Sequence, residues 1–403
     1  MRKLFGPLAA LLLATAVSAN ASQKIVSFDP AYKGGNIIER GIESIGGKVT
    51  RNFTLINALV ATFPDDVKDA SIYTLKGVTH VDEDRYIKWI EEAPSMNSVQ
   101  LPSVESVLNM VRTGEGWEAP VFGEIKADTD PAQKEIPWGV RRVNAAAAWD
   151  YGAGKGVKVA IVDTGMDYTH PDLAPNYKGG YNIVADNDNP MDDQGHGTHV
   201  SGTIGAVQDL KGVVGIAPKA DLYAVKVLDK NGSGQYSWIV AGIEWAINHH
   251  MDVINMSLGG GSGTDALKQV MTKAKEAGVT VVCAAGNDSG PVNYPAKYPE
   301  AIAVSASDSS DKIASFSSRG AEIAVIAPGV SVYSTRKGGG FTTMSGTSMA
   351  SPHVAGLAAL AVGAGAKGPD AVRAALKAAA TPLPGLTPAE QGAGLVDAFK
   401  LVR

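Results

Sequence analysis

Val157-Lys158-Val159-Ala160-Ile161-Val162-Asp163-Thr164-Gly165 is the stretch that decides the fold of this chain. Before Asp163 it is apolar except for one lysine, which predicts a strand buried on both faces, as in a parallel sheet that helices cover on each side. Such a sheet carries its chemistry at the carboxyl ends of the strands. Asp163, directly after the strand, is therefore a candidate site residue.

Further apolar strands follow, with helical segments between several of them. The expected strands are residues 221–228, 252–256, 280–284, 301–305 and 322–327, and the expected helices are residues 197–206, 237–249 and 264–277. This alternation predicts an α/β fold with a doubly wound, mostly parallel sheet flanked by helices.

A second informative stretch is Gly346-Thr347-Ser348-Met349-Ala350-Ser351-Pro352-His353, which an uncharged apolar run follows. Proline is tolerated in a first helical turn, so we expect Ser348 at or just before a helix N-terminus. Backbone N–H groups and the helix dipole favour developing negative charge there, which suits the nucleophile of an acyl transfer. An ordinary N-cap serine is the alternative that this stretch alone leaves open.

Length and composition set limits on the class of protein. The chain has 403 residues, enough for a large domain and a smaller one. Its formal net charge of −5 gives no reason to expect nucleic acid or an anionic membrane as a partner. The single cysteine, Cys283, excludes an intrachain disulfide and is expected to be a small buried hydrophobe.

The N-terminal residues have the pattern of a secretory signal peptide. Arg2 and Lys3 precede an apolar run over residues 8–17, and Ala19-Asn20-Ala21 fits a cleavage site. The apolar run is short for a membrane span, although an uncleaved anchor is the alternative. We therefore expect an exported, extracellular protein with no membrane attachment after cleavage.

Residues 24–90 are expected to form a small separate unit. Strands are predicted at residues 24–28, 48–53, 58–63 and 78–82, and helices at residues 36–45 and 64–75. Asn36, with Glu39 three residues on, resembles a capping box. The order β-α-β-β-α-β is that of a ferredoxin-like fold. Residues 91–135 are richer in proline and polar residues and indicate a linker, with one short amphipathic helix over residues 104–111.

Four motifs occur in an order that matches a known family. Val-Asp-Thr-Gly (162–165), Gly-His-Gly-Thr-His-Val (195–200), Ala-Ala-Gly-Asn (284–287) and Gly-Thr-Ser-Met-Ala-Ser-Pro-His (346–353) closely resemble the subtilisin-like serine proteases, of the secreted bacterial type. The resemblance covers roughly residues 136–403, and residues 24–90 resemble the inhibitory propeptide of that family.

The resemblance implies a serine endopeptidase whose catalytic residues stand in the family's order. Ser348 would be the nucleophile, His196 the general base and Asp163 the group that orients the histidine. The side-chain amide of Asn287 and the backbone N–H of Ser348 would stabilise the oxyanion. A protease-like fold without activity, serving as a binding or assembly factor, is the alternative.

The resemblance also implies substrate-binding segments. They are Gly232, Ser233 and Gly234 as an edge that pairs with an extended peptide, Tyr236 as the lid of a distant pocket, and Ser257, Leu258, Gly259, Ala284, Ala285 and Gly286 as the walls of the main pocket. None of them is charged, which favours a large apolar side chain before the cleaved bond. Two features depart from the family: the loop over residues 287–294 is shorter, and Asn293 stands where glycine is usual at the pocket floor.

A structural calcium site is the metal site that the resemblance implies. Its ligands would be the side chains of Asp172 and Asp209, the carbonyls of Val207, Lys211 and Val213, and Gln133. Solvated loop aspartates are the alternative. His196 and His199 have the spacing of a metal pair, but no glutamate completes a zinc motif, so His199 and His353 are expected to be structural. His249 and His250 are expected at the surface.

Together these inferences describe a self-processing zymogen. The expected parts are a signal peptide (1–21), a propeptide that acts as intramolecular inhibitor and chaperone (22–92), a cleaved linker (93–133) and a peptidase domain (134–403). Its substrates would be polypeptides, and the enzyme is expected to be a monomer.

Overall fold

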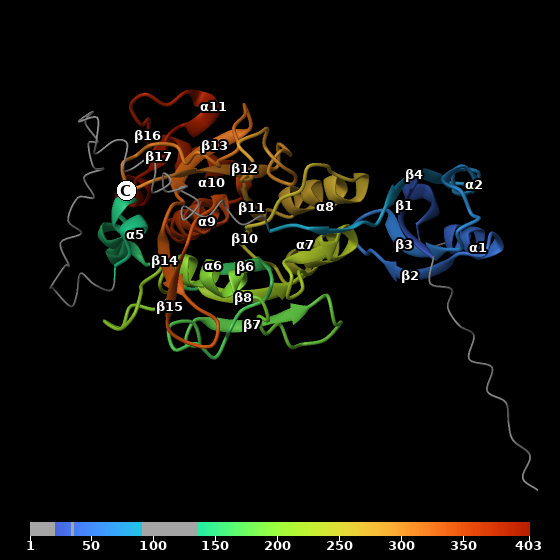
Figure 1. The fold of residues 1–403 in the computed structure, drawn as a ribbon, viewed down its shortest axis with the longest axis horizontal. Helices are drawn as coiled ribbons and strands as arrows, with labels where there is room; N and C mark the ends of the chain where they lie inside the picture. The colour runs from blue at the N-terminus through green and yellow to red at the C-terminus, as the bar shows by residue number, and fades with distance from the viewer. Residues whose placement is uncertain (1–20, 34–35, 91–135) are drawn as a thin grey trace, which may run out of the picture. The chain divides into compact units, whose positions relative to one another are not determined.

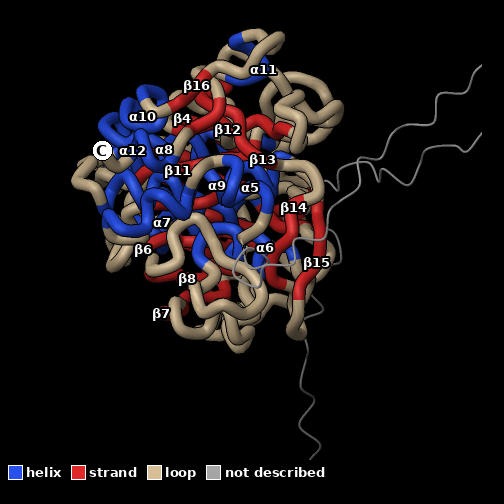
Figure 2. The backbone as a smooth tube through the Cα atoms, turned by 90° about the vertical axis from the view of Figure 1, so that its left-hand side faces the viewer, coloured by secondary structure: helices blue, strands red, loops and turns tan. Residues whose placement is uncertain are grey.

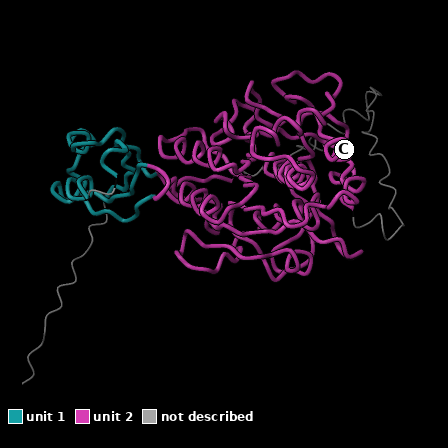
Figure 3. The backbone as a smooth tube through the Cα atoms, turned by 180° about the vertical axis from the view of Figure 1, so that it is seen from behind, with its two compact units in different colours: residues 1–53, 57–84 teal, residues 54–56, 85–403 magenta. Residues whose placement is uncertain are grey.

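The computed structural model describes residues 21–33, 36–90 and 136–403. The expected signal peptide, Gln133 and the predicted helix over residues 104–111 lie outside the described residues. The chain forms two compact units, one of residues 1–53 and 57–84 and the other of residues 54–56 and 85–403 (Figure 3). Residues from Arg85 onward belong to the second unit, and the expected boundaries at residues 92 and 133 lie outside the described residues.

The first unit has the predicted element order β-α-β-β-α-β. Its elements are β1 (Ser22–Phe28), η1 (Pro30–Tyr32), α1 (Ile37–Ser44), β2 (Lys48–Asn52), β3 (Ala58–Phe63), α2 (Asp69–Tyr73) and β4 (Val78–Glu83). The sheet order is β2-β3-β1-β4, and β1 pairs antiparallel with β3 and β4. Buried side chains such as Ile42, Phe63 and Ile72 form its core.

Two local predictions for this unit are wrong. Asn36 precedes α1 in a left-handed conformation (φ 50°), and its side chain makes no capping hydrogen bond, so the predicted capping box is absent. The second helix is shorter than the predicted residues 64–75. Main-chain position, rather than residue type, decides whether a capping side chain reaches the free N–H groups of a helix.

The second unit is built on a nine-stranded sheet. Its strands are β6 (Lys158–Asp163), β7 (Tyr177–Asn182), β8 (Asp221–Lys226), β10 (Val253–Met256), β11 (Thr280–Ala284), β12 (Ala301–Ser307), β13 (Ile323–Pro328), β16 (Ala380–Thr381) and β17 (Leu395–Val396). The order is β16-β17-β13-β12-β11-β10-β6-β8-β7, and every pair except β16–β17 is parallel. The predicted doubly wound, mostly parallel sheet is confirmed.

The strand order reverses beside β6, which lies between β8 and β10. The chain proceeds from β6 to one side through β7 and β8, and then to the other side through β10, β11, β12 and β13. A reversal of this kind opens a crevice at the carboxyl ends of the strands. Asp163, the last residue of β6, lies at that crevice.

Helices cover both faces of this sheet. The helices α6 (His196–Gly205) and α9 (Thr347–Gly363) pack against each other and against the central strands on one face, whereas α7 (Tyr236–Asn248) and α8 (Asp265–Glu276) pack together on the other (Figure 1). Every residue of α6 is buried, and α9 is buried from Thr347 to Ala361. The two helices that begin at His196 and next to Ser348 are thus interior elements.

The remaining elements surround this core (Figure 2). They are β5 (Tyr86–Lys88), α5 (Trp138–Arg142), η3 (Ala145–Tyr151), β9 (Ser233–Gln235), β14 (Val332–Thr335), β15 (Phe341–Met344), α10 (Pro369–Ala378), α11 (Pro388–Gln391) and α12 (Ala398–Leu401). The strands β14 and β15 form an antiparallel hairpin. Within the described part of the chain, none of the helices has the length and apolar character needed to cross a membrane.

Candidate active site

Asp163 and His196 form a buried pair. The Nδ1 atom of His196 lies 2.9 Å from Oδ1 and 3.0 Å from Oδ2 of Asp163. Helix α6 begins so close to the loop after β6 that a Cβ atom on Gly197 would lie 2.1 Å from the carbonyl oxygen of Gly165. Glycine at position 197 therefore allows the contact that brings the histidine onto the carboxylate.

The environment of His196 prepares it to accept and hold a proton. Burial disfavours the charged imidazolium, but the charge and hydrogen bond of Asp163, with a further contribution from the charge of Asp192, outweigh it, so the pKa of His196 is raised. Its Nε2 atom is buried and has no hydrogen-bond partner among the described residues. The free nitrogen is the one that a general base would use, since Nδ1 is bound to Asp163.

Ser348 is the second residue of α9, at the expected helix N-terminus. Its Oγ atom donates to the carbonyl oxygen of Ser257 at 3.1 Å and makes no hydrogen bond to Nε2 of His196. The expectation that Pro352 lies in the first turn is wrong, because it is the sixth residue of the helix. Having no N–H, it leaves the carbonyl of Ser348 without its helical donor, and the hydroxyl of Ser257 donates to that oxygen at 2.8 Å.

Asn287 lies beside Ser348 with its amide held in one orientation. Both the main-chain N–H and the hydroxyl of Thr347 donate to its Oδ1 atom, at 2.8 and 2.9 Å, which turns the NH₂ group away from Thr347. A Cβ atom on Gly346 would lie 3.4 Å from Nδ2 of Asn287 and 3.5 Å from the backbone nitrogen of Ser348. The missing side chain at Gly346 thus keeps open a space that both donors border.

A pocket adjoins these residues. It is lined by Trp89, Leu258, Gly259, Ala284, Gly286, Asn287, Asn293, Thr347 and Ser348. Most of the predicted wall residues are among them. Ser257 and Ala285, expected as wall residues, are not, since both are fully buried behind the pocket. The first of these two instead holds the main chain of Ser348.

Asn293 lies in the lining of this pocket, between Gly259 and Gly286. Its Nδ2 atom is 2.6 Å from the position that a Cβ atom on Gly286 would take, and its own Cβ is 3.2 Å from the corresponding position on Gly259. The side chain therefore fills the space between the two walls. The side chain narrows the pocket. Its amide also adds a polar group to a lining that has no charged side chain.

The predicted substrate edge is occupied by a segment of the same unit. Strand β5 pairs antiparallel with β9, with Ile87 opposite Gly234 and Lys88 opposite Ser233. The N–H groups of Trp89 and Ile90 donate to the carbonyl of Gly232, at 3.0 and 3.2 Å. This segment is bound as an added strand, the mode expected for an extended peptide.

The aromatic residue of this segment is anchored on the other side as well. The N–H of Gly259 donates to the carbonyl of Trp89 at 3.0 Å, and the indole Nε1 donates to the carbonyl of Gly234. The indole ring packs edge-on against Tyr236 with centroids 4.8 Å apart. Tyr236, the predicted lid of a distant pocket, is thus in contact with the bound segment.

The predicted calcium ligands within the described residues lie together. Asp172 is buried, and its Oδ2 accepts the N–H of Val213 at 3.1 Å, while Oδ1 has no partner among the described residues. Burial raises the pKa of Asp172, and the nearby charge of Asp209 adds to the rise. Within the described part of the chain, no hydrogen-bond donor reaches the carbonyl oxygens of Val207, Lys211 and Val213.

This donor set fits a hard cation. Two carboxylates and three carbonyl oxygens without donors are the ligand type that calcium prefers. Among the described residues there is no group of three or more histidine, cysteine and acidic side chains that could hold a metal ion.

The other singled-out residues have the environments expected of them. His199 and His353 are fully buried, and burial lowers the pKa of His199 to about 3 and that of His353 to about 4. His249 and His250 are exposed. Cys283 is fully buried, and burial raises the pKa of its thiol, which makes the reactive thiolate inaccessible.

Three residues near the site were missed by the sequence analysis. Thr347 orients Asn287, Trp89 lines the pocket, and Asp192 contributes to the electrostatics of His196. Thr347 lies inside a recognised motif, so its position next to Ser348 was the available signal. Nothing in the local sequence around residue 89 indicates that it reaches the pocket, because that contact joins segments far apart in the chain.

Comparisons with known proteins agree with the geometry. A family model described as the subtilase family matches residues 154–394. Subtilisin amylosacchariticus from Bacillus subtilis subsp. amylosacchariticus is 44% identical over 326 residues, which cover 79% of this chain and 74% of that protein. Subtilisin from Bacillus pumilus is 53% identical over 234 residues, which cover 56% of this chain and 84% of the relative. M-protease from Shouchella clausii (strain KSM-K16) is 49% identical over 239 residues, which cover 59% of this chain and 62% of the relative.

Proposed function

Because this chain belongs to the subtilase family of serine endopeptidases, we propose that it cleaves peptide bonds through an acyl-enzyme with Ser348, His196 and Asp163 as its triad. The observation that carries the proposal is the buried pair of His196 and Asp163, whose free Nε2 atom has no other partner among the described residues.

The proposed reaction begins with the attack of the Ser348 hydroxyl on the scissile carbonyl. His196 takes the hydroxyl proton at Nε2 and later gives it to the leaving amine. Asp163 keeps the imidazole oriented and stabilises its charged form. A water molecule then hydrolyses the acyl-enzyme, with His196 again acting first as base and then as acid.

The tetrahedral intermediate carries a negative charge on the former carbonyl oxygen. The NH₂ group of Asn287 and the N–H of Ser348 would donate to it, and no acceptor among the described residues takes that N–H. Removal of one such donor typically costs about 3–4 kcal/mol of transition-state stabilisation.

Inhibition by the chain's own N-terminal part is a further element of the proposal. The segment Tyr86–Lys88 and Trp89 occupy the edge and pocket that a substrate would use. A segment bound in this way blocks the site until it is released. We therefore propose a zymogen in which the residues before the linker act as an intramolecular inhibitor and folding aid.

Substrate preference follows from the pocket. Its lining carries no charged side chain, which supports apolar side chains before the cleaved bond, although Asn293 limits the depth. Polypeptides are the proposed substrates, the signal-like residues 1–21 support secretion, and a monomer is the proposed state.

A structural calcium ion completes the proposal. Asp172 and Asp209 with the carbonyls of Val207, Lys211 and Val213 would hold it, and Gln133 is a further proposed ligand. A cation there would neutralise two nearby carboxylates and tie the loop over residues 207–213 to the buried aspartate.

The test is expression of the full chain beside its Ser348→Ala variant. The parent should hydrolyse casein, react covalently with a fluorophosphonate probe and cut itself within the linker, and N-terminal sequencing then places that cut. The Ser348→Ala variant should do none of these. A parent that stays full-length, unlabelled and inactive would favour the alternative of a binding protein with a protease fold.

A further inference from the structure

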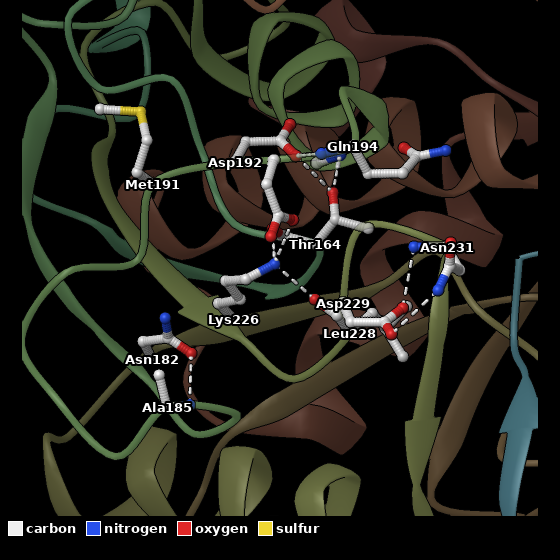
Figure 4. Close-up of polar contacts among 12 residues, drawn as sticks. Thr164, Asn182, Ala185, Met191, Asp192, Gln194, Lys226, Leu228, Asp229 and Asn231 are labelled. Carbon is white, nitrogen blue, oxygen red and sulfur yellow. Dashed lines mark hydrogen bonds and ion pairs between the residues drawn. The ribbon is translucent and has the colours of Figure 1, made fainter.

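A second buried carboxylate lies next to the Asp163–His196 pair. Asp192 is 3% exposed and accepts hydrogen bonds on both of its oxygens, and Figure 4 shows it beside Thr164 and Gln194. Its Oδ1 atom accepts the hydroxyl of Thr164 at 2.9 Å and the N–H groups of Gln194 and Gly195 at 2.9 and 2.8 Å. Its Oδ2 atom accepts the N–H and the hydroxyl of Thr198, at 2.9 and 2.6 Å.

These donors come from the two segments that carry the catalytic pair. Thr164 directly follows Asp163, and its own N–H donates to Oδ1 of that aspartate at 2.7 Å. Its hydroxyl also accepts the N–H of Gly197 at 2.9 Å. Thr198 lies two residues after His196, in the first turn of α6. One carboxylate thus ties the loop after β6 to the start of the helix.

Lys226 holds the same loop from the other side (Figure 4). This lysine is 3% exposed, and its ammonium group donates to the carbonyl oxygens of Thr164 and Leu228, at 2.8 and 2.6 Å, and to Oδ1 of Asp193 at 2.7 Å. Every proton of the ammonium group therefore has an acceptor. Thr164, the residue after Asp163, is thus held at its main-chain carbonyl by Lys226 and at its side-chain hydroxyl by Asp192.

The position of His196 gives this arrangement a chemical role. His196 is the first residue of α6, where free N–H groups and the helix dipole create a positive potential that disfavours an imidazolium. Asp192 accepts N–H groups at this end of the helix, including that of Thr198, and so places negative charge there.

We propose that Asp192 is a positioning residue for the reaction: it fixes the His196 imidazole against Asp163 and supplies a second negative charge that stabilises the imidazolium. This inference rests on the proposed triad and extends it to a fourth side chain. Asp192 acts through Thr164, Thr198 and the helix start, and it contacts no reacting atom.

The charges around His196 support the assignment. The titratable and charged groups on the surrounding elements are Asp163, Asp192, Asp193, Lys226, Lys337 and His199. Asp193 is paired with Lys226, and Lys337 donates to the main chain of Asp193. Burial lowers the pKa of His196, whereas the charge and hydrogen bond of Asp163 raise it, and the charge of Asp192 raises it further. Loss of that charge therefore lowers this pKa.

The Asp192→Asn variant tests the proposal in the full-length chain after self-processing. The measurement is kcat and KM for a peptide p-nitroanilide against pH, normalised by fluorophosphonate titration of active sites. We expect kcat to fall roughly tenfold with KM unchanged. The acid limb of kcat/KM should move to lower pH, because the neutral histidine persists further into acid.

The matched control is Asp167→Asn. Asp167 lies on the loop after β6 that also carries Thr164, is buried like Asp192 (5% against 3% exposed), and its carboxylate binds Thr169 and the N–H of Gly338 rather than the start of α6. In the Asp167→Asn variant, the acid limb of kcat/KM should stay at the same pH as in the parent. An unchanged kcat and acid limb in Asp192→Asn, or an equal shift in both variants, would overturn the proposal. A parent that is neither labelled nor active would instead contradict the proposed function.

A second pair of variants keeps the proposal testable if Asp192→Asn does not fold. Thr164→Val removes the hydroxyl that joins Asp192 to Gly197 at nearly constant volume, whereas Thr164→Ser retains it. Thr164→Val should lower kcat roughly tenfold, and Thr164→Ser should restore it. Equal kcat values for the two variants would contradict the proposal.

Discussion

The two serines Ser257 and Ser348 exchange hydrogen bonds. The hydroxyl of Ser257 donates to the carbonyl of Ser348 at 2.8 Å, and the hydroxyl of Ser348 donates to the carbonyl of Ser257 at 3.1 Å. The first of these bonds is needed because Pro352 has no N–H for that carbonyl. The start of α9 is thereby attached to the segment after β10, the strand that pairs with β6.

The first prediction concerns this exchange. Ser257→Ala should lower the free energy of unfolding by about 1–3 kcal/mol, since a buried carbonyl loses its donor. Urea unfolding in a Ser348→Ala background, which prevents self-digestion, measures the change. In the presence of Pro352→Ala the cost should be smaller, because alanine returns the helical N–H. An equal cost with and without Pro352→Ala would show that the carbonyl of Ser348 is not the affected group.

A second prediction concerns Thr347. Thr347→Val removes the hydroxyl that donates to Asn287 and accepts the N–H of Gly286. The amide of Asn287 then has one restraint fewer, and kcat should fall roughly tenfold at constant KM. This fall is smaller than the one expected if the Asn287 amide itself were removed. Thr347→Ser is the matched control and should retain most of the parent's kcat. Steady-state kinetics with a peptide p-nitroanilide distinguish the two, and an equal fall in both variants would show that the hydroxyl of residue 347 is not what sustains kcat.

Asn293 gives a prediction about specificity. Asn293→Gly removes the side chain that fills the end of the pocket between Gly259 and Gly286. The ratio of kcat/KM for a substrate with phenylalanine before the cleaved bond to that for one with alanine should rise about tenfold or more. The alanine substrate serves as the control, since it does not reach the pocket end. A ratio equal to that of the parent would mean that Asn293 does not limit the side chain.

The buried histidines predict a loss of stability in acid. His199 and His353 have folded-state pKa values of about 3 and about 4, below the ordinary value of 6.5. Above pH 6.5 both histidines are neutral in the folded and in the unfolded chain, so the full free energy of unfolding is present. As the pH falls toward 4, the unfolded chain takes up protons that the folded chain excludes, at a cost of about 3 kcal/mol for each histidine.

Urea unfolding of the Ser348→Ala variant between pH 7 and pH 4 measures this loss. NMR of the labelled imidazole rings provides the control, because the resonances of the two buried rings should not titrate between pH 7 and pH 5. A free energy of unfolding that is constant over this range would contradict the prediction.

Removal of calcium is the last prediction. Chelation with EDTA should lower the unfolding temperature of the Ser348→Ala variant, and added calcium should restore it. Asp172→Asn removes one carboxylate charge with little change in shape, so the response to calcium should weaken. Exposed Asp186→Asn, outside the proposed ligand set, is the control and should respond like its parent. Equal unfolding temperatures with EDTA and with calcium would exclude the site.

The strands that the sequence predicted well are the buried ones. Residues 280–284 and 301–305 are apolar runs that coincide with β11 and with most of β12. Strand β7 (Tyr177–Asn182) was missed, because it is rich in glycine and polar residues and lies at the edge of the sheet. The two-residue strands β16 and β17 were missed as well, since pairing with each other and with β13 defines them rather than any local pattern.

The sequence by itself determined the sheet class and the candidate residues for the chemistry, because buried strands and the motifs around Asp163, His196 and Ser348 are local patterns. The tertiary structure decided how those residues are held. The exchange between Ser257 and Ser348, the contact of Trp89 with the pocket and the network of Asp192 each join segments far apart in the chain. Such contacts depend on where the strands place their ends, and a local pattern does not contain that information.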